Sequence, residues 1–454
     1  MGYNVSGSKQ KAINILCDEF RKYNFIDPED CEKLGVKRGL RNADNTGVLA
    51  GLTLICDVVG YEMIDGVKTA TPGKLLYRGI DLDEFVAGVI ESGRYGFEEL
   101  SWLLLFGKLP TQQQLDFFND VLADFRALPP GFAEDMIMKA PSPDVMNKLA
   151  RSILAMYSYD DEAEDLSMGN VMRQCIEIIA GTPTIITNAY QVKRRNYDHK
   201  SMYFHLPKRE HSTAQTILRT VRPDKRFTEE EAHLLDLCLI LHAEHGGGNN
   251  SAFACRVLSS SLTDTYSALA SAVGSLKGPR HGGANLKVTQ MLEGMKEAIS
   301  HPASEQDVKD YLRRLLRREA GDRSGLIYGI GHAVYTVSDP RAQILKRYAE
   351  HLAVEKGFGE DLHLLQMVEK LAPQVFAEEK GVDKNLCANV DLYSGLVYRT
   401  LGIPEELFTP LFAVARMPGW CAHRMEELMF GGRIIRPAYK NLTAKQSYVP
   451  INQR

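Results

Sequence analysis

The sequence predicts an all-α protein with one short β segment near its N-terminus. Beyond residue 82, apolar residues recur almost everywhere at the spacing of amphipathic or buried helices. β-Branched residues and turn signals are concentrated in a single stretch, 48–85. The chain also lacks the glycine-rich patterns GxGxxG and GxxxxGK[ST], which argues against a Rossmann or P-loop enzyme. At 454 residues it can bury a large core, and we expect two domains.

The charge balance and the cysteine pattern indicate a soluble cytoplasmic protein. There are 54 basic and 58 acidic residues, so the net charge of −4 provides no basic field for nucleic acid. No stretch approaches 18 uninterrupted apolar residues, and the N-terminus has no apolar region of signal-peptide length, so we expect no membrane association. The eight cysteines are scattered without a C-x-x-C spacing, as expected of reduced core residues.

The elements before residue 228 begin with an amphipathic stretch at 11–20. The β segment at 48–85 follows, and Asp65-Gly66 marks a turn within it. Residues 196–227 are polar and rich in His, Lys and Arg, which predicts an irregular connection. Helices are expected at 82–92, 97–106, 111–126, 143–158, 166–180 and 184–194.

A buried helix is predicted to begin at Thr228 and to carry two histidines at its end. Thr228 and Glu231 have the spacing of a capping box, and apolar residues then occupy most positions up to residue 241. The triple glycine at 246–248 is expected to stop the helix after His242 and His245.

A second helix, built from small residues over 264–276, is predicted to end at Gly278-Pro279. His281 follows this break beside Gly282-Gly283, where the backbone can approach a ligand closely. A single histidine near a helix end is usually a cap or a surface group. Two glycine-rich breaks that both present imidazoles indicate a site instead.

The helices resume after residue 283. Ser304 with Asp307 predicts a capped amphipathic helix. Asp339-Pro340 opens another, with proline at the first helical position and Gly357 at its end. Further helices are expected at 359–371, 391–400 and 404–430.

Three charged residues occupy positions, at helix starts or within an apolar run, where a charged side chain requires a partner or a function. Arg341, in the first turn of its helix, opposes the helix dipole, and either an anionic ligand or a structural salt bridge would explain it. Asp391, near a helix start, is either an N-cap or a functional carboxylate. Arg416 lies within an apolar run, where a buried arginine needs a carboxylate or phosphate partner.

Imidazoles, one carboxylate and several arginines at element ends suit a small polycarboxylate substrate. The arginines would hold it, an imidazole would polarise it and the carboxylate would act as the base. No nucleophilic elbow and no cofactor motif is evident. A metal site at His242 and His245 is the alternative, but the chain has neither HExxH nor a cysteine at zinc spacing. Non-covalent acid–base chemistry without a metal is favoured.

Six separated motifs resemble, in their order and spacing, those of the citrate synthase family. They are HAEHGGGN, GPRHGGAN, GIGHAVY with DPR, NVDLYSG, FAVAR and RP. The stretch LLYRGIDLDEF resembles the early β segment of that family. The resemblance covers about residues 45–440.

The resemblance implies a two-domain helical homodimer of the tricarboxylic acid cycle. It would condense acetyl-CoA, a co-substrate, with oxaloacetate and water to give citrate and CoA, without a tightly bound cofactor. A small domain at 284–401 would close over the substrates, and a large domain would comprise 1–283 and 402–454. The close alternative is 2-methylcitrate synthase, which uses propionyl-CoA on the same residues.

Three catalytic roles are carried over by motif. Asp391 would take a proton from the methyl group of acetyl-CoA, His281 would donate a hydrogen bond to the enolate oxygen, and His332 would polarise the ketone of oxaloacetate. An inactive helical scaffold is the alternative from another class, and the presence of all three residues argues against it.

The resemblance also implies how the substrates bind. Arg341 and Arg416 would hold the carboxylates of oxaloacetate, with His245 and Asn249 nearby. Arg436 would reach into the site of the partner subunit. The basic residues 193–195 follow a helix and are either contacts of the CoA phosphates, with Arg195 as the predicted one, or a solvated basic helix end.

The chain departs from the family pattern at two places. Glu244 stands where members usually have Asp. Thr336-Val337-Ser338 follows HAVY, where many members carry Lys or Arg, and this removes one expected contact of the CoA phosphates. Arg280 or Lys277 could substitute for it.

Overall fold

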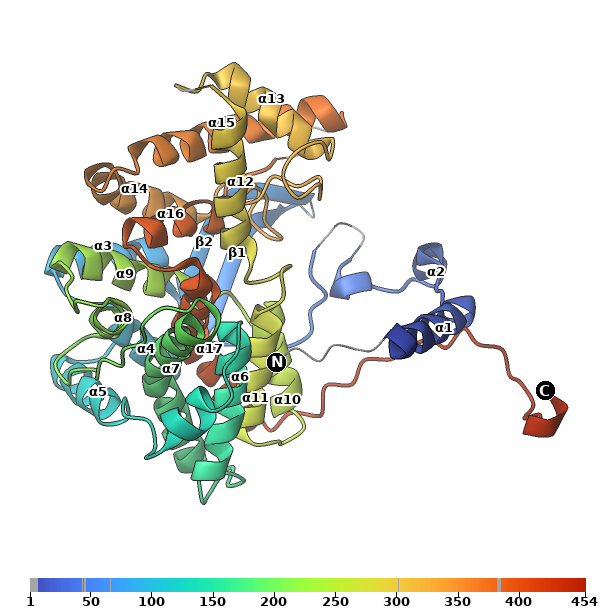
Figure 1. Ribbon diagram of the computed structural model, residues 1–454, viewed down its shortest axis with the longest axis horizontal. Helices are drawn as coiled ribbons and strands as arrows, with labels where there is room; N and C mark the ends of the chain where they lie inside the picture. Colours follow the sequence, from blue (N-terminus) through green and yellow to red (C-terminus); the bar gives the residue numbers. More distant parts are fainter. Residues whose placement is uncertain (1–6, 43, 45, 66, 301, 382–384) are drawn as a thin grey trace. The chain divides into compact units, whose positions relative to one another are not determined.

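The computed structural model describes residues 7–42, 44, 46–65, 67–300, 302–381 and 385–454, and it confirms a mainly helical fold with one small sheet (Figure 1). By their internal contacts the residues form two units, Met1–Gly51 and Leu52–Arg454. The first unit holds helices α1 (Gly7–Tyr23) and α2 (Pro28–Lys33). Residues 11–20, the predicted amphipathic stretch, lie inside α1, and their apolar side chains Ile13, Leu16 and Phe20 are exposed.

The predicted β segment forms an antiparallel sheet in the order β1 (Cys56–Ile64), β2 (Val67–Tyr77) and β3 (Ile80–Asp81). Ile64 pairs with Val67, so the expected turn does lie between these strands. Asp65 has the left-handed φ of 50° that such a turn needs, and Gly66 lies outside the described residues.

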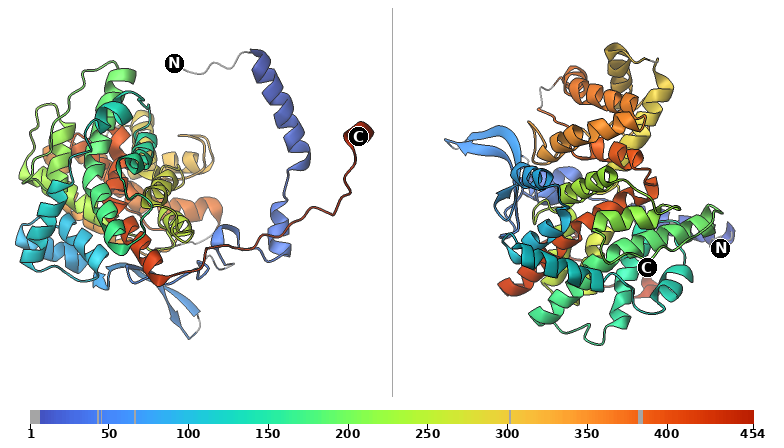
Figure 2. Two further views of the ribbon diagram at one scale, coloured as in Figure 1. Left: turned by 90° about the horizontal axis from the view of Figure 1, so that it is seen from below. Right: turned by 90° about the vertical axis from the view of Figure 1, so that its left-hand side faces the viewer.

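Ten helices of the second unit surround a common apolar core (Figures 1 and 2). They are α3 (Leu82–Ser92), α4 (Phe97–Phe106), α5 (Gln112–Asp124), α6 (Val145–Met156), α7 (Met168–Tyr197), α8 (Thr213–Val221), α9 (Glu229–His242), α10 (Asn250–Ser259), α11 (Thr265–Leu276) and α17 (Phe408–Phe430). Helix α17 packs against α4, α7, α9, α10 and α11, and its side chains from residue 410 to 425 are buried. It therefore lies at the centre of this group and contacts half of its other members or more.

The remaining helices, all from residues 284–400, gather in the upper part of the view in Figure 1. They are α12 (Ala284–Ala298), α13 (Glu305–Leu316), α14 (Pro340–Glu355), α15 (Gly359–Lys380) and α16 (Asp391–Thr400). The predicted capping box of Ser304 and Asp307 is present at the start of α13, and Asp339 caps α14 in front of Pro340.

Several predicted boundaries are wrong. The two helices expected at 166–180 and 184–194 are one helix, α7, which continues through Pro183. A proline inside a helix costs about 3 kcal/mol, but this middle section of α7 is buried against α6, α8 and α17, and burial of its apolar side chains outweighs that cost. Helix α15 likewise continues through Pro373 to Lys380, beyond the predicted end at 371.

Two further predictions need correction. The stretch 196–227 is not wholly irregular, because α8 lies within it and begins with a capping box of Ser212 and Gln215. The helix expected from residue 404 begins with the 3₁₀ turn Glu405–Leu407, and the α-helix starts at Phe408.

The described residues also bear on the expectations about membrane-spanning helices and about the cysteines. None of their helices combines the length and the apolar character that crossing a bilayer requires. All eight cysteines are free thiols, and five of them are buried, as expected of core residues.

Candidate active site

Two loops that are far apart in the sequence pair just before α16 begins. The segment 329–331 pairs with 387–389 through hydrogen bonds from Gly331 N to Cys387 O (2.7 Å) and from Asn389 N to Gly329 O (2.9 Å). Gly329 is required at this crossing, because a Cβ atom there would lie 2.8 Å from Leu392 Cδ1 and its φ is +81°. The pairing places His332 and Asp391 just after two neighbouring segments of the chain.

The backbone fixes the tautomer of His332. Its Nδ1 accepts hydrogen bonds from the amides of Val334 and Tyr335, both at 3.1 Å. Amide N–H groups only donate, so Nδ1 carries no hydrogen, and the ring is neutral with its hydrogen on Nε2. The ring stacks on Tyr335 and meets His245 edge to face, with centroids 5.0 Å apart.

His245 comes from α9, whose capping box of Thr228 and Glu231 is present as predicted. The helix ends at His242, and the triple glycine follows three residues later, so glycine redirects the chain after the end rather than stopping the helix. Burial and the charge of Arg341 hold the pKa of His245 well below its usual range, so this imidazole is neutral.

Asp391 is the first residue of α16 and does not cap it, so the N-cap alternative is wrong and the role of a functional carboxylate stays a prediction. Its Oδ1 is shielded from solvent and has no hydrogen-bond partner among the described residues. Burial of the carboxyl raises its pKa to about 6, while the charges of Arg341 and Arg416 limit the rise. An unpartnered carboxylate of raised basicity is suited to taking up a proton.

Arg341 makes the salt bridge that was one of its two expected explanations. Its Nε and Nη2 donate to the two carboxylate oxygens of Asp339, at 3.0 and 2.7 Å, and both residues are buried. Asp339 Oδ2 also accepts from the amide of Val390 at 3.3 Å, so this pair is attached to the start of α16. Sequence reasoning missed Asp339, although its place beside Arg341 in DPR was a signal.

Arg416 enters the same region from α17 and is fully buried. Its Nε donates to His242 O at 2.6 Å, and its guanidinium lies 4.9 Å from the ring centre of Phe412. Nη1 and Nη2 have no hydrogen-bond partner in the part of the chain that the structure describes. A buried guanidinium with two unused donor groups is suited to a carboxylate ligand.

His281 lies just beyond the end of α11, as predicted. Its Nε2 is 2.9 Å from Ser251 Oγ, which also accepts from Trp420 Nε1 at 3.2 Å and lies 2.9 Å from Asn249 Oδ1. Burial, with the charge of Arg416, lowers the pKa of His281 to about 4, so the ring is neutral near pH 7. Ser251 and Trp420 are supporting residues that the sequence did not reveal.

The site therefore combines a basic carboxylate, three imidazoles and two buried arginines. Residues 43–438 match the family model described as "Citrate synthase, C-terminal domain". The chain belongs to the citrate synthase family. It is accordingly an enzyme, of the transferase class.

Citrate synthases from several prokaryotes are similar over most of their length. The chain is 36% identical to that of Acidithiobacillus ferridurans over 402 residues, which is 86% of this chain and 94% of the relative. It is 35% identical to that of Synechocystis sp. over 386 residues, 85% of this chain and 89% of the relative. The solved structure of Thermoplasma acidophilum citrate synthase, a ternary complex with carboxymethyl coenzyme A and oxaloacetate, aligns with a TM-score of 0.76 and 26% identity and covers 92% of this chain and 99% of that one.

Two predicted citrate synthase residues lie apart from this cluster of interactions. Arg436 is exposed in the extended segment after α17. Arg195 is exposed at the end of α7, whereas its neighbours are engaged: Lys193 with Asp198 and Glu406, and Arg194 with Tyr203. Of the two proposed substitutes for the missing phosphate contact, Lys277 pairs with Asp144 at 3.6 Å and Arg280 is exposed.

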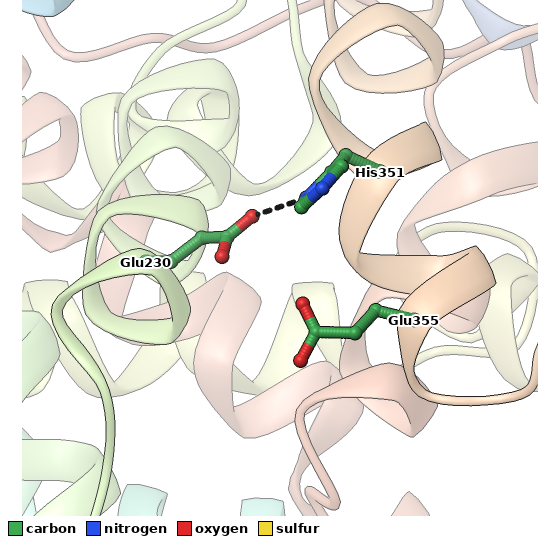
Figure 3. A group of neighbouring side chains, drawn as sticks. All are labelled: Glu230, His351 and Glu355. Carbon is green, nitrogen blue, oxygen red and sulfur yellow. Dashed lines mark hydrogen bonds and ion pairs between the residues drawn. The ribbon is translucent and has the colours of Figure 1, made fainter.

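One group of side chains among the described residues has metal-ligating character, and it lies elsewhere. Glu230 of α9 and His351 and Glu355 of α14 bring their ligand atoms within 4.8 Å of one another (Figure 3). All three are exposed, and His351 Nδ1 lies 2.9 Å from Glu230 Oε1, so an ion pair explains the arrangement. Glu230 raises the pKa of His351, in agreement with this pairing.

Proposed function

We propose that the chain condenses acetyl-CoA with oxaloacetate and water to give citrate and CoA. The observation that carries the proposal is Asp391, a carboxylate of raised pKa whose Oδ1 has no partner among the described residues. It interacts with the charges of two buried arginines, and its segment pairs with the one that leads to His332. A dicarboxylate needs the arginines, and a weakly acidic carbon needs the base. Family membership and the oxaloacetate and CoA analogue bound by the Thermoplasma relative support the same reaction.

The first step is removal of a proton from the methyl carbon of acetyl-CoA by Asp391. The electron pair moves onto the thioester oxygen, and His281 donates a hydrogen bond to that oxygen. A carboxylate of pKa about 6 cannot hold the proton of so weak a carbon acid unless the oxygen is stabilised at the same moment.

The nucleophilic carbon then attacks the ketone of oxaloacetate, and a carbon–carbon bond forms. His332 polarises the ketone through its Nε2–H, which its fixed tautomer directs away from the backbone. Arg341 and Arg416 hold the carboxylates, with His245 and Asn249 beside them. Water finally cleaves the thioester of citryl-CoA and releases citrate and CoA.

The assembly and the CoA contacts belong to the same proposal. Helices α12 to α16 form the small domain, residues 284–401, that closes over the substrates, and residues 1–283 and 402–454 form the large domain. Two chains make a cytoplasmic homodimer in which Arg436 of each chain serves the partner subunit's site. Arg195 contacts the CoA phosphates, and Arg280, rather than the paired Lys277, replaces the basic residue absent after HAVY.

A thiol-release assay tests the proposal directly. The purified protein should release CoA from acetyl-CoA only when oxaloacetate is present. Propionyl-CoA in the same assay separates citrate formation from 2-methylcitrate formation, because one additional methyl group changes selectivity by about 10- to 200-fold. Absence of oxaloacetate-dependent release with either thioester would refute the proposed function.

The pH dependence of turnover should show an acid limb set by Asp391. Its carboxyl must be ionised to act, and its raised pKa of about 6 means that the active form is lost as the pH falls through this value. We expect kcat to be constant near pH 8 and to fall about tenfold for each pH unit well below pH 6. A limb near pH 4, the range of an ordinary aspartate, would contradict this.

Arg416→Leu should weaken oxaloacetate binding strongly. Loss of a buried, charge-assisted partner costs about 2 kcal/mol or more, which corresponds to about a 30-fold rise in the KM for oxaloacetate. Arg341→Leu is less informative, because it also leaves Asp339 buried without its partner. Arg424→Leu is the matched control: it removes another buried arginine of α17, which donates to Thr263 O outside the site. Equal KM values for the Arg416 and Arg424 variants would contradict the assignment.

A further inference from the structure

The loop that carries His245 also carries a buried carboxylate, that of Glu244, which interacts electrostatically with Arg416. Glu244 is fully buried, and its Oε1 accepts a hydrogen bond from His245 N at 2.8 Å. Its Oε2 has no hydrogen-bond partner among the described residues, and neither have the two terminal amino groups of Arg416. Burial lowers the pKa of Arg416, and Glu244 is the strongest influence against that shift, so the two charges act on each other.

This arrangement raises a problem for substrate binding. A carboxylate and a guanidinium that are both buried and incompletely bonded attract each other strongly in the low-dielectric interior. If Glu244 paired with both terminal amino groups of Arg416, these donors would be lost to a substrate, whereas the bonds from Arg341 to Asp339 use Nε and Nη2 and leave out Nη1. Something must therefore hold Glu244 in its present position.

His423 of α17 is in the position to do so. Its Nε2 lies 3.1 Å from Glu244 Oε1, and both side chains are fully buried. Its Nδ1 accepts a hydrogen bond from Arg256 Nε at 3.0 Å. Because arginine can only donate, Nδ1 carries no hydrogen and the ring hydrogen is on Nε2, which contacts Glu244 Oε1 at 3.1 Å without meeting hydrogen-bond geometry.

Two further contacts make this arrangement rigid. Arg256 is held in turn by Glu427, at 2.9 Å, and by Glu426. Glu244 Oε2 rests against the backbone of α17 at Gly419, where a Cβ atom would overlap with it. His423 and Gly419 thus contact the carboxylate of Glu244 from the same helix, α17.

We propose that His423 is a positioning residue that holds Glu244 away from Arg416 and so leaves both terminal amino groups of Arg416 for a substrate carboxylate. The proposal rests on the proposed function, in which Arg416 binds oxaloacetate. The proposal also changes the interpretation of Glu244. Its carboxylate would compete with the substrate carboxylate for Arg416, and His423 of α17, far away in the sequence, prevents this.

Two substitutions of similar character separate this role from a general effect on folding. In His423→Asn the shorter amide can still accept from Arg256 but cannot reach Glu244, whereas in His423→Gln the amide reaches both. We expect His423→Asn to raise the KM for oxaloacetate about tenfold or more with kcat changed much less, because Asp391 and His281 are not touched. His423→Gln should restore most of the affinity.

The double variant E244Q/H423N gives the decisive comparison. It removes the carboxylate that His423→Asn releases, so its KM for oxaloacetate should fall at least about fivefold below that of His423→Asn, although it carries one more substitution. E244Q alone completes the cycle, and melting temperatures of all variants show whether each is folded. If His423→Asn does not fold, His423→Phe, which keeps the ring volume and cannot hold Glu244, carries the same expectation.

The proposal is overturned if His423→Asn leaves the KM for oxaloacetate unchanged, or if the double variant binds as weakly as His423→Asn. Either outcome leaves the proposed function standing, provided that the wild-type protein shows oxaloacetate-dependent thiol release. Absence of that release in the wild type would instead remove the proposed function itself.

Discussion

Asp391→Ala should leave a folded protein whose turnover is about 10³- to 10⁴-fold lower than that of the wild type. The carboxylate acts on the methyl group of acetyl-CoA, and this interaction exists mainly in the transition state, so kcat falls rather than the affinity for oxaloacetate. Oxaloacetate binding, measured by calorimetry, should change by less than about threefold, because Arg341 and Arg416 remain in place.

Removal of Asp391 should also not destabilise the fold. Its pKa is raised above the ordinary value, so at pH 8 the ionised, buried form costs stability, and its loss should raise the melting temperature slightly. When the pH is below the pKa of an ordinary aspartate, this gain in melting temperature should vanish, since the carboxyl is then protonated in both the folded and the unfolded state. Asp391→Asn, which keeps the shape, is the matched control. Turnover near the wild-type value in either variant would remove Asp391 from the mechanism.

Local signals predicted much of the fold because they are encoded over a few residues. The capping boxes at Thr228 and Ser304 and the Asp339-Pro340 start all mark helix ends where they were expected. The capping box at Ser212 had the same signature and was overlooked within a polar stretch. Two helices were predicted where there is one, because buried packing over the length of α7 overrides the local penalty of Pro183.

The candidate site likewise contains residues that local sequence patterns indicate and residues that they do not. His332, Asp391 and Arg341 were found because each stands at a break in a helical pattern, where functional residues gather. The long-range contacts of His281 and Glu244 could not be found in this manner. Ser251, Trp420, Glu244 and His423 interact only because α17 crosses the ends of α9 and α10, and such long-range contacts leave no periodicity in the sequence.

The segment after α17 bears on the proposal of a shared site. Helix α17 ends at Phe430, and Gly431 takes the left-handed conformation that redirects the chain. Ile435 N then donates to Ser260 Oγ at 3.0 Å, and the residues from 436 onward are exposed. Apolar side chains along this segment, among them Tyr439, Tyr448 and Ile451, lack cover within the described residues. In the proposed homodimer, the partner subunit would cover them.

Two inactive homodimers should regain activity when their subunits are exchanged. One carries Asp391→Ala and the other Arg436→Ala, and they are mixed by mild unfolding and refolding. In a mixed dimer, one site combines Asp391 of the second chain with Arg436 of the first and is intact, while the other site has lost both residues. Random exchange makes half of the dimers mixed, so the specific activity should recover to about a quarter of the wild-type value. A surface arginine on a frayed terminus predicts a different result, because Arg436→Ala would then be active alone. If both variants are inactive and verified exchange restores nothing, Arg436 serves its own chain and the site is not shared.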